Sequence, residues 1–129
     1  MIVDSSALVA ILTQEPEAEH FTRLIFSGTP ARISAATFVE ISIVVEGKLG
    51  DAGVRMLDSL LQRTGLTMEP VSVEQAHIAR QAWSSYGKGR HPASLNFGDT
   101  FTYALAKTTG EAVLCKGTDF ARTDVLLVL

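Results

Sequence analysis

The sequence is poor in cysteine, tryptophan and positive charge, and it has no long apolar run. Its one cysteine, Cys115, cannot form an internal disulfide, so the hydrophobic core must stabilise the fold. The chain lacks the roughly 20 consecutive apolar residues that a membrane-spanning helix needs. The segment 1–4 has no basic residue of the kind that starts a signal peptide. We therefore expect a cytoplasmic protein that is not associated with a membrane.

Positive charge is scarce because 11 lysines and arginines face 14 aspartates and glutamates, for a formal net charge of −3. This balance argues against a protein that coats nucleic acid by bulk electrostatic attraction. Any contact with nucleic acid must therefore be local. A mobile basic loop offers one such place, since Lys88, Arg90 and His91 could either hold phosphate groups or simply face solvent.

What the sequence does contain is a regular alternation of short apolar runs and helical patterns. With 129 residues, 47% of them hydrophobic, the chain is expected to form a single domain over residues 1–129. The alternation predicts a three-layer α/β/α domain around a parallel sheet of about five strands. The expected strands cover residues 2–3, 32–34, 66–71, 112–115 and 125–129. The expected helices cover residues 7–12, 16–26, 35–47, 51–64, 72–86 and 96–107.

Capping residues predict where two of these helices start. Ser5 or Ser6 can cap the first helix, and Ser72 with Gln75 fits a capping box at the start of the fifth. Helical spacing then predicts which residues of the fifth helix face the core. These residues are Ala76, Ala79, Ala82, Trp83 and Tyr86.

The last helix begins with a carboxylate. Asn96 can serve as its N-cap, with Asp99 three residues later. The core face is predicted to consist of Phe101, Ala104, Leu105 and Thr108. Asp99 is thereby placed where the core meets solvent. Either Asp99 only closes a capping box and favours the positive end of the helix dipole, or it belongs to a reactive site.

Three further acids favour a reactive site. Asp4 and Asp119 each follow an expected strand, and Glu40 interrupts an almost wholly apolar helix. Ligands of α/β sheets bind at the carboxyl ends of the strands, so the four acids could meet there. Two charges about 4 Å apart repel by about 4 kcal/mol at an effective dielectric of about 20, so such a cluster needs a cation. Carboxylates select Mg²⁺ or Mn²⁺, which can ionise a water and stabilise the oxygens of a phosphoryl displacement.

Two other polar residues receive structural interpretations. Cys115 follows an apolar run and is expected to be a buried strand thiol rather than a nucleophile. Asp124 precedes the last expected strand, so it is either a neighbour of the acidic site or, as we favour, a turn residue.

The ordered acidic motifs resemble those of PIN-domain proteins, and most closely the VapC toxins. The matching segments are MIVDSSAL at 1–8, FVE at 38–40, NFGD at 96–99 and KGTDF at 116–120. The resemblance implies a Mg²⁺- or Mn²⁺-dependent endoribonuclease, the toxin of a toxin–antitoxin pair. It also implies that Asp4, Glu40, Asp99 and Asp119 are both the catalytic residues and the metal ligands. The partners it implies are an RNA substrate, a second copy in a homodimer, and a VapB-type antitoxin.

Two interpretations from other classes compete with a nuclease. A receiver domain has similar length and layers, but it needs paired acids after its first strand and a phosphoacceptor aspartate after its third. Here Asp4 is followed by serines, and Glu69 and Pro70 offer no aspartate. A non-catalytic binding module with the same fold would be expected to have lost some of the acids, yet all four are present.

Overall fold

The computed structural model describes residues 1–128 of the chain. The order of the elements agrees with the sequence prediction, and their boundaries differ by a few residues. The elements are β1 (Ile2–Val3), α1 (Ser5–Leu12), α2 (Ala18–Ile25), β2 (Arg32–Ser34), α3 (Ala35–Thr64), β3 (Thr67–Glu69), α4 (Val73–Tyr86), α5 (Phe97–Thr109), β4 (Val113–Leu114) and the short 3-10 helix η1 (Phe120–Arg122).

The four strands form one parallel sheet in the order β3-β2-β1-β4. Between β1 and β4, which is the last strand in this order, Ile2 pairs with Val113 and Val3 pairs with Leu114. The fifth predicted strand, residues 125–129, is reduced to a single parallel bridge between Val113 and Leu127. Because β4 has only two residues, few of its backbone groups are available to pair with this segment. Leu129, the last residue of the predicted strand, lies outside the described residues.

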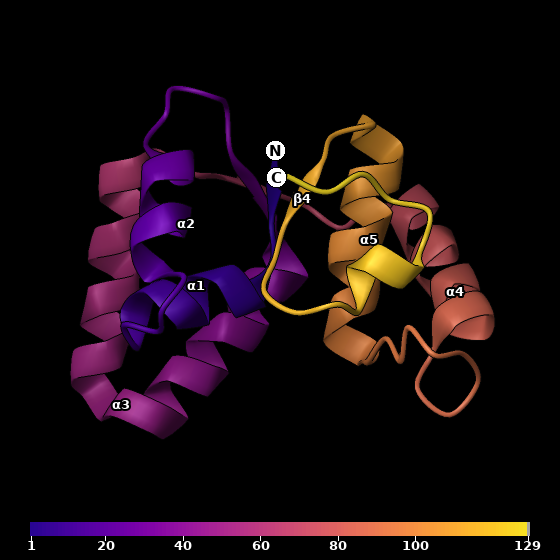
Figure 1. Ribbon diagram of the computed structural model, residues 1–129, viewed down its shortest axis with the longest axis horizontal. Coiled ribbons are helices and arrows are strands. Elements are labelled where there is room, and N and C mark those ends of the chain that lie inside the picture. The colour runs from indigo at the N-terminus through magenta and orange to yellow at the C-terminus, as the bar shows by residue number, and fades with distance from the viewer. Residues whose placement is uncertain (129) are drawn as a thin grey trace.

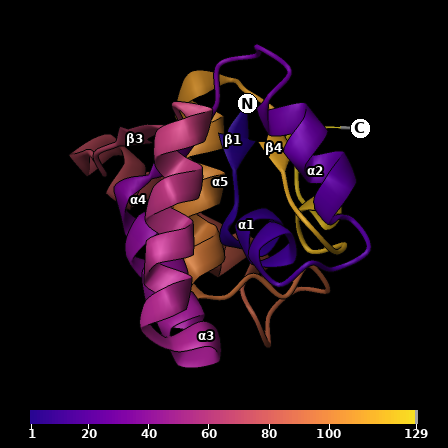
Figure 2. The same ribbon diagram turned by 90° about the vertical axis from the view of Figure 1, so that its left-hand side faces the viewer.

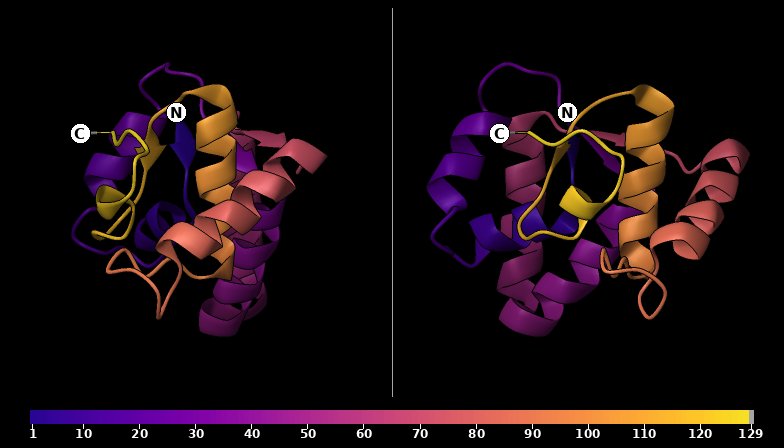
Figure 3. Two further views of the ribbon diagram at one scale, coloured as in Figure 1. Left: turned by 90° about the vertical axis from the view of Figure 1, so that its right-hand side faces the viewer. Right: turned by 45° about the vertical axis from the view of Figure 1, so that its right-hand side comes forward.

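Successive residues of β1 and β4 alternate between two hydrophobic clusters. Ile2 and Val113 are buried in the cluster to which α4 and α5 contribute, whereas Val3 and Leu114 are buried in the cluster of α1, α2 and α3. Figure 1 shows these two sets of helices on opposite sides of the strands. The outermost helix, α4, packs against α5, as both views in Figure 3 show. The three-layer α/β/α prediction is therefore confirmed.

Helix α3 is bent where the sequence predicts one helix to end and another to begin. Gly50 has φ 64° and ψ −154°, so the backbone leaves the helical conformation at this residue. Only glycine adopts such angles without strain, because a Cβ would clash with the backbone. Figure 2 shows α3 running along one side of the molecule. Both of its halves belong to the side layer that also contains α1 and α2.

Two local predictions need correction. The cap of α1 is Asp4, whose side chain accepts a hydrogen bond from the Ser6 N–H, and Ser5 and Ser6 are already helical. Aspartate and serine are about equally good N-cap residues, so residue type alone could not show which of Asp4, Ser5 and Ser6 caps α1. In α4, Ala76 and Trp83 are exposed, because α5 covers the face that contains Ala79 and Ala82. Within residues 1–128, no helix is long and apolar enough to cross a membrane.

Candidate active site

Asp4 lies at the carboxyl end of β1 and is only 2% exposed. Its Oδ1 accepts a hydrogen bond of 2.7 Å from the Thr102 hydroxyl on α5. Its Oδ2 accepts hydrogen bonds from the Ser6 hydroxyl at 2.7 Å and from the Ser6 backbone N–H at 3.1 Å. Both carboxylate oxygens are thus engaged by donors, as the burial of an ionised carboxylate requires.

Glu40 reaches the site from α3, where its carboxylate lies directly against Gly98 of α5. A Cβ at position 98 would overlap the Glu40 carboxylate, so the contact exists only because residue 98 is glycine. The Oε1 atom of Glu40 is buried without a hydrogen-bond partner among the described residues. Burial raises the pKa of Glu40, the Ser5 side chain lowers it, and the charge of Asp4 raises it further.

Asp99 lies at the start of α5, where the predicted capping box is confirmed. Asp99 N–H donates to Asn96 Oδ1 at 2.9 Å, and Asn96 N–H donates to Asp99 Oδ2 at 2.9 Å. Burial nevertheless raises the pKa of Asp99 to about 7, against the lowering effect of the Asn96 backbone hydrogen bond. The charges of Asp4, Glu40 and Asp119 each raise that pKa further. These four acids are therefore close enough to interact.

Asp119 is the exposed member of the group, in the turn between β4 and η1. Its side chain does not cap η1, which leaves the carboxylate available to the site. Cys115 lies beside the same acids, and the prediction of a buried strand thiol needs correction, because Cys115 follows the end of β4 and is half-buried. Burial and the charges of Asp4, Asp99 and Asp119 raise the pKa of its thiol to about 12. The thiol therefore stays protonated at neutral pH, in agreement with a structural cysteine.

The donor set fits a hard divalent cation. All four groups are carboxylates, the ligand type that Mg²⁺ and Mn²⁺ prefer, and the buried Glu40 Oε1 lacks a partner. As arranged, no three His, Cys, Asp or Glu side chains of residues 1–128 are close enough to enclose an ion. Like charges at short range repel, which opposes any closer approach of the carboxylates. A cation would remove this opposition.

Sequence reasoning missed several residues that shape this site. Thr102 and Ser6 hold the Asp4 carboxylate, and Gly98 makes room for Glu40. One signal was present for Gly98, because a glycine in the first turn of a helix is unfavourable unless something approaches closely. Thr102 gave a weaker signal, because a polar residue among the buried residues of α5 suggests that its hydroxyl has a hydrogen-bond partner.

The loop that carries Lys88, Arg90 and His91 is anchored at its base rather than free. Lys88 N–H donates to Leu95 O at 2.8 Å, and the His91 Nδ1 atom accepts a hydrogen bond of 3.0 Å from Ala93 N–H. The His91 ring also meets the Tyr86 ring edge to face, at 5.1 Å between centroids. The side chains of Lys88 and Arg90 are exposed and free to meet an anion.

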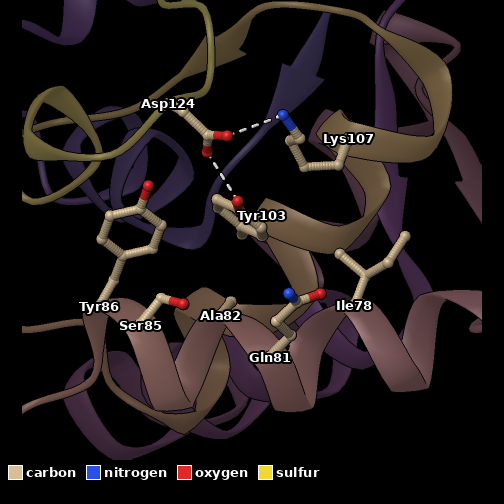
Figure 4. A pocket seen from close by; sticks show the side chains of 8 residues that line it. All are labelled: Ile78, Gln81, Ala82, Ser85, Tyr86, Tyr103, Lys107 and Asp124. Atoms are coloured by element: carbon tan, nitrogen blue, oxygen red, sulfur yellow. Dashed lines mark hydrogen bonds and ion pairs between the residues drawn. The ribbon is translucent and has the colours of Figure 1, made fainter.

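Asp124 is held by partners of its own on α5. Its Oδ1 accepts a 2.6 Å hydrogen bond from the Tyr103 hydroxyl, and its Oδ2 accepts a 2.9 Å hydrogen bond from Lys107 Nζ. Figure 4 shows this arrangement at the edge of a pocket of about 380 Å³ between α4 and α5. These hydrogen bonds lower the pKa of Asp124. The structural interpretation of Asp124 fits these contacts, because its carboxylate fastens the C-terminal segment to α5.

Comparison with known proteins identifies the family. A family model described as PIN domain matches residues 1–126. Ribonuclease VapC of Mycolicibacterium smegmatis is 46% identical over 128 residues, which cover 99% of each chain. Of the solved structures, Mycobacterium tuberculosis VapC20, described as a Sarcin-Ricin loop cleaving toxin, has a TM-score of 0.78 at 18% identity, with 98% of this chain and 97% of that chain covered.

A second solved structure is VapBC2 from Rickettsia felis, bound to a DNA fragment from their promoter. It has a TM-score of 0.76 at 15% identity and covers 99% of this chain and 96% of that chain. The sheet, the acidic edge and the family match together define a PIN domain. Within that family, the chain belongs to the VapC ribonucleases, the toxins of VapBC systems. The receiver-domain interpretation is therefore wrong.

The contact between Gly98 and Glu40 predicts a substitution that separates activity from stability. In Gly98→Ala the new methyl group must push the Glu40 carboxylate aside, which should reduce RNA cleavage by roughly a hundredfold. The free energy of unfolding should change by less than about 1 kcal/mol, because alanine favours the helix and the displaced atoms end a flexible side chain. Gly47→Ala, a helical glycine with open space around it, is the control and should cleave normally. Normal cleavage by Gly98→Ala would contradict the role of this contact.

The raised pKa of Asp99 predicts how stability depends on pH. The folded protein keeps the Asp99 proton up to about pH 7, whereas the unfolded chain releases it near 3.8, so stability is lost as pH rises between these values. Asparagine cannot ionise. Metal-free Asp99→Asn should therefore unfold at higher urea concentration than wild type at pH 8, and the difference should vanish near pH 4. Replacement of the exposed Asp58 should show no such pH-dependent gain, and a pH-independent effect of Asp99→Asn would contradict the analysis.

Proposed function

We propose that this ribonuclease is an endoribonuclease that depends on Mg²⁺ or Mn²⁺, held by Asp4, Glu40, Asp99 and Asp119. The observation that carries the proposal is the group of four carboxylates around the buried Asp99, whose pKa is raised by burial and further by the charges of the other three acids, together with Glu40 Oε1, which has no partner among the described residues. When bound, such an ion would lower the pKa of a water molecule and offset the charge of the phosphate oxygens.

The protein's own residues hold the four carboxylates in position. Asp4 is held by donors on both of its oxygens, and Asp99 is held through one oxygen by its capping box. Glu40 is fixed against Gly98, with Oε1 still unpaired. Asp119 is exposed and joins the group from the turn after β4. Two acids held by hydrogen bonds, one acid packed against Gly98 and one exposed acid therefore offer oxygen ligands from four different segments of the chain.

Phosphate contact by the anchored basic loop accounts for substrate binding in this proposal. Lys88 and Arg90 project into solvent just before α5, the helix that begins with Asp99. His91 is a weaker candidate, since its Nδ1 atom already accepts a hydrogen bond within the loop. Two local cations suit a protein with a net charge of −3, which cannot attract RNA by overall charge.

The partners we propose are a VapB-type antitoxin and a second copy of the chain. The Rickettsia felis structure, a VapBC complex, supports an antitoxin partner for this fold. An apolar cleft of about 480 Å³ between α3 and α5 supports a homodimer. Val39, Ile43 and Phe97 line this cleft and are 54%, 66% and 76% exposed. Exposed apolar patches of this kind mark interaction surfaces. We propose that the complex of toxin and antitoxin is cytoplasmic.

The direct test of the proposed function is metal-dependent cleavage. Purified protein should cleave RNA with Mg²⁺ or Mn²⁺, lose all cleavage in excess chelator, and recover when Mn²⁺ is added back. Analysis of the fragments should show internal cuts rather than stepwise loss from one end. Glu40→Gln serves as a matched variant that keeps the side-chain shape but removes its charge, and it should be inactive at every Mn²⁺ concentration. Full activity in chelator would refute the metal proposal.

The basic loop yields a prediction about salt. Replacing both Lys88 and Arg90 with glutamine should weaken RNA binding and reduce the slope of log affinity against log salt by roughly 1.4, if each side chain meets one phosphate of a single strand. The melting temperature should not change, because both side chains are exposed. Lys48 and Arg55, two exposed cations of α3, provide the control with the same change in net charge. Identical slopes for the two double variants would mean that the loop has no specific role.

A further inference from the structure

Two buried threonines connect the elements that carry three of the acids. Thr37 lies on α3, three residues before Glu40, and Thr102 lies on α5, three residues after Asp99. Both side chains are fully buried. Their Oγ1 atoms are 3.3 Å apart, and the Thr102 hydroxyl is 2.7 Å from Asp4 Oδ1. A continuous chain of hydrogen bonds thus joins α3, α5 and the end of β1.

The direction of this chain follows from the protons available. An ionised carboxylate only accepts hydrogen bonds, so the Thr102 hydroxyl must donate its one proton to Asp4. Thr102 Oγ1 can then only accept from Thr37, which donates. Each bond in such a series polarises the next, so the Thr37 hydroxyl strengthens the hydrogen bond between Thr102 and Asp4.

Thr102 supplies the contact to Asp4 from a distant part of the chain. The Ser6 donors belong to the helix that Asp4 itself caps, two residues away, and bind Oδ2. Thr102 is 98 residues away and binds Oδ1. A carboxylate held through one oxygen can still turn about its own bond, whereas donors on both oxygens fix its plane. Thr102 therefore sets the direction in which the Asp4 lone pairs point.

Packing alone does not require a hydroxyl at this position. Thr102 is followed on α5 by the buried residues Tyr103, Ala104, Leu105 and Ala106. Valine has the same shape as threonine and would fill the same space without a polar group to satisfy. The hydroxyl is thus explained by its acceptor, Asp4.

We propose that Thr102 is a positioning residue, whose hydroxyl orients the Asp4 carboxylate for a divalent cation, and that Thr37 orients Thr102 in turn. This inference rests on the proposed metal-dependent function. It extends the acidic site to two hydroxyls that coordinate no ion themselves. Partners of this kind, which hold the ligands of a metal, typically change metal affinity by roughly 10-fold to 100-fold when removed.

The experiment measures Mn²⁺ affinity by calorimetry in wild type, Thr102→Val, Thr102→Ser and Thr108→Val. Thr102→Val should bind Mn²⁺ roughly 10-fold to 100-fold more weakly, and Thr102→Ser, which keeps the hydroxyl, should bind close to wild type. Thr108→Val is the control, since the Thr108 hydroxyl bonds only backbone carbonyls of its own helix. At limiting Mn²⁺, kcat for RNA cleavage should fall in Thr102→Val while KM for RNA stays unchanged.

The outcomes separate this inference from the proposed function. If wild type binds Mn²⁺ and Thr102→Val binds it equally well, the positioning role is refuted and the metal site stands. If wild type binds no Mn²⁺ or Mg²⁺, the metal site itself is refuted, and this inference falls with it. Should Thr102→Val fail to fold, Thr37→Val decides the matter, because it keeps the bond between Thr102 and Asp4 but removes the donor behind it. Thr37→Val should then lower Mn²⁺ affinity severalfold. Wild-type affinity in Thr37→Val would refute the proposed series of hydrogen bonds from Thr37 through Thr102 to Asp4.

Discussion

The mutual repulsion of buried carboxylates is the constraint on which the rest of the structure depends. Asp4 and Asp99 are only 2% and 8% exposed, and burial, together with the charges of Asp4, Glu40 and Asp119, raises the pKa of Asp99 to about 7. Such groups remain close only if the backbone that carries them cannot retreat. Ile2 and Val3 are fully buried in two separate clusters, which fixes the strand that ends at Asp4. The hydrophobic core therefore stabilises an arrangement that electrostatics opposes.

Helix capping solves part of this electrostatic problem. Asp4 caps α1 and Asp99 completes the capping box of α5, so the N-termini of two helices are directed at the same group of acids. The partial positive charge at a helix N-terminus favours a carboxylate. The backbone N–H groups of Ser6 and Asn96 donate to the carboxylates of Asp4 and Asp99 and help to fix their positions independently of any ion. In this fold, Asp4 and Asp99 each cap a helix and also belong to the acidic site. A substitution of either residue should therefore affect both the helix cap and the geometry of the site.

Features encoded by short spacings could be predicted from the sequence, and contacts between distant segments could not. The capping box of Asn96 and Asp99, the break in α3 near Gly50 and the succession of strands and helices along the chain all follow from local patterns. Periodicity also showed that Glu40 stands alone in an apolar helix. It could not show that Glu40 meets Gly98, because that contact depends on how two helices pack. The bond between Thr102 and Asp4 spans 98 residues and was invisible for the same reason.

Asp119 and Asp124 show why residue type alone could not define the site. Both are exposed aspartates of the segment after β4, five positions apart. Asp124 has a hydrogen-bond partner on each oxygen, Tyr103 and Lys107, so its charge is already compensated. The charge of Asp119 instead acts on Asp99 and raises its pKa. A carboxylate becomes a candidate ligand when the fold places it among other acids without a compensating cation. The sequence motif and the turn position suggested this distinction between Asp119 and Asp124, and the contacts in the structure give its physical reason.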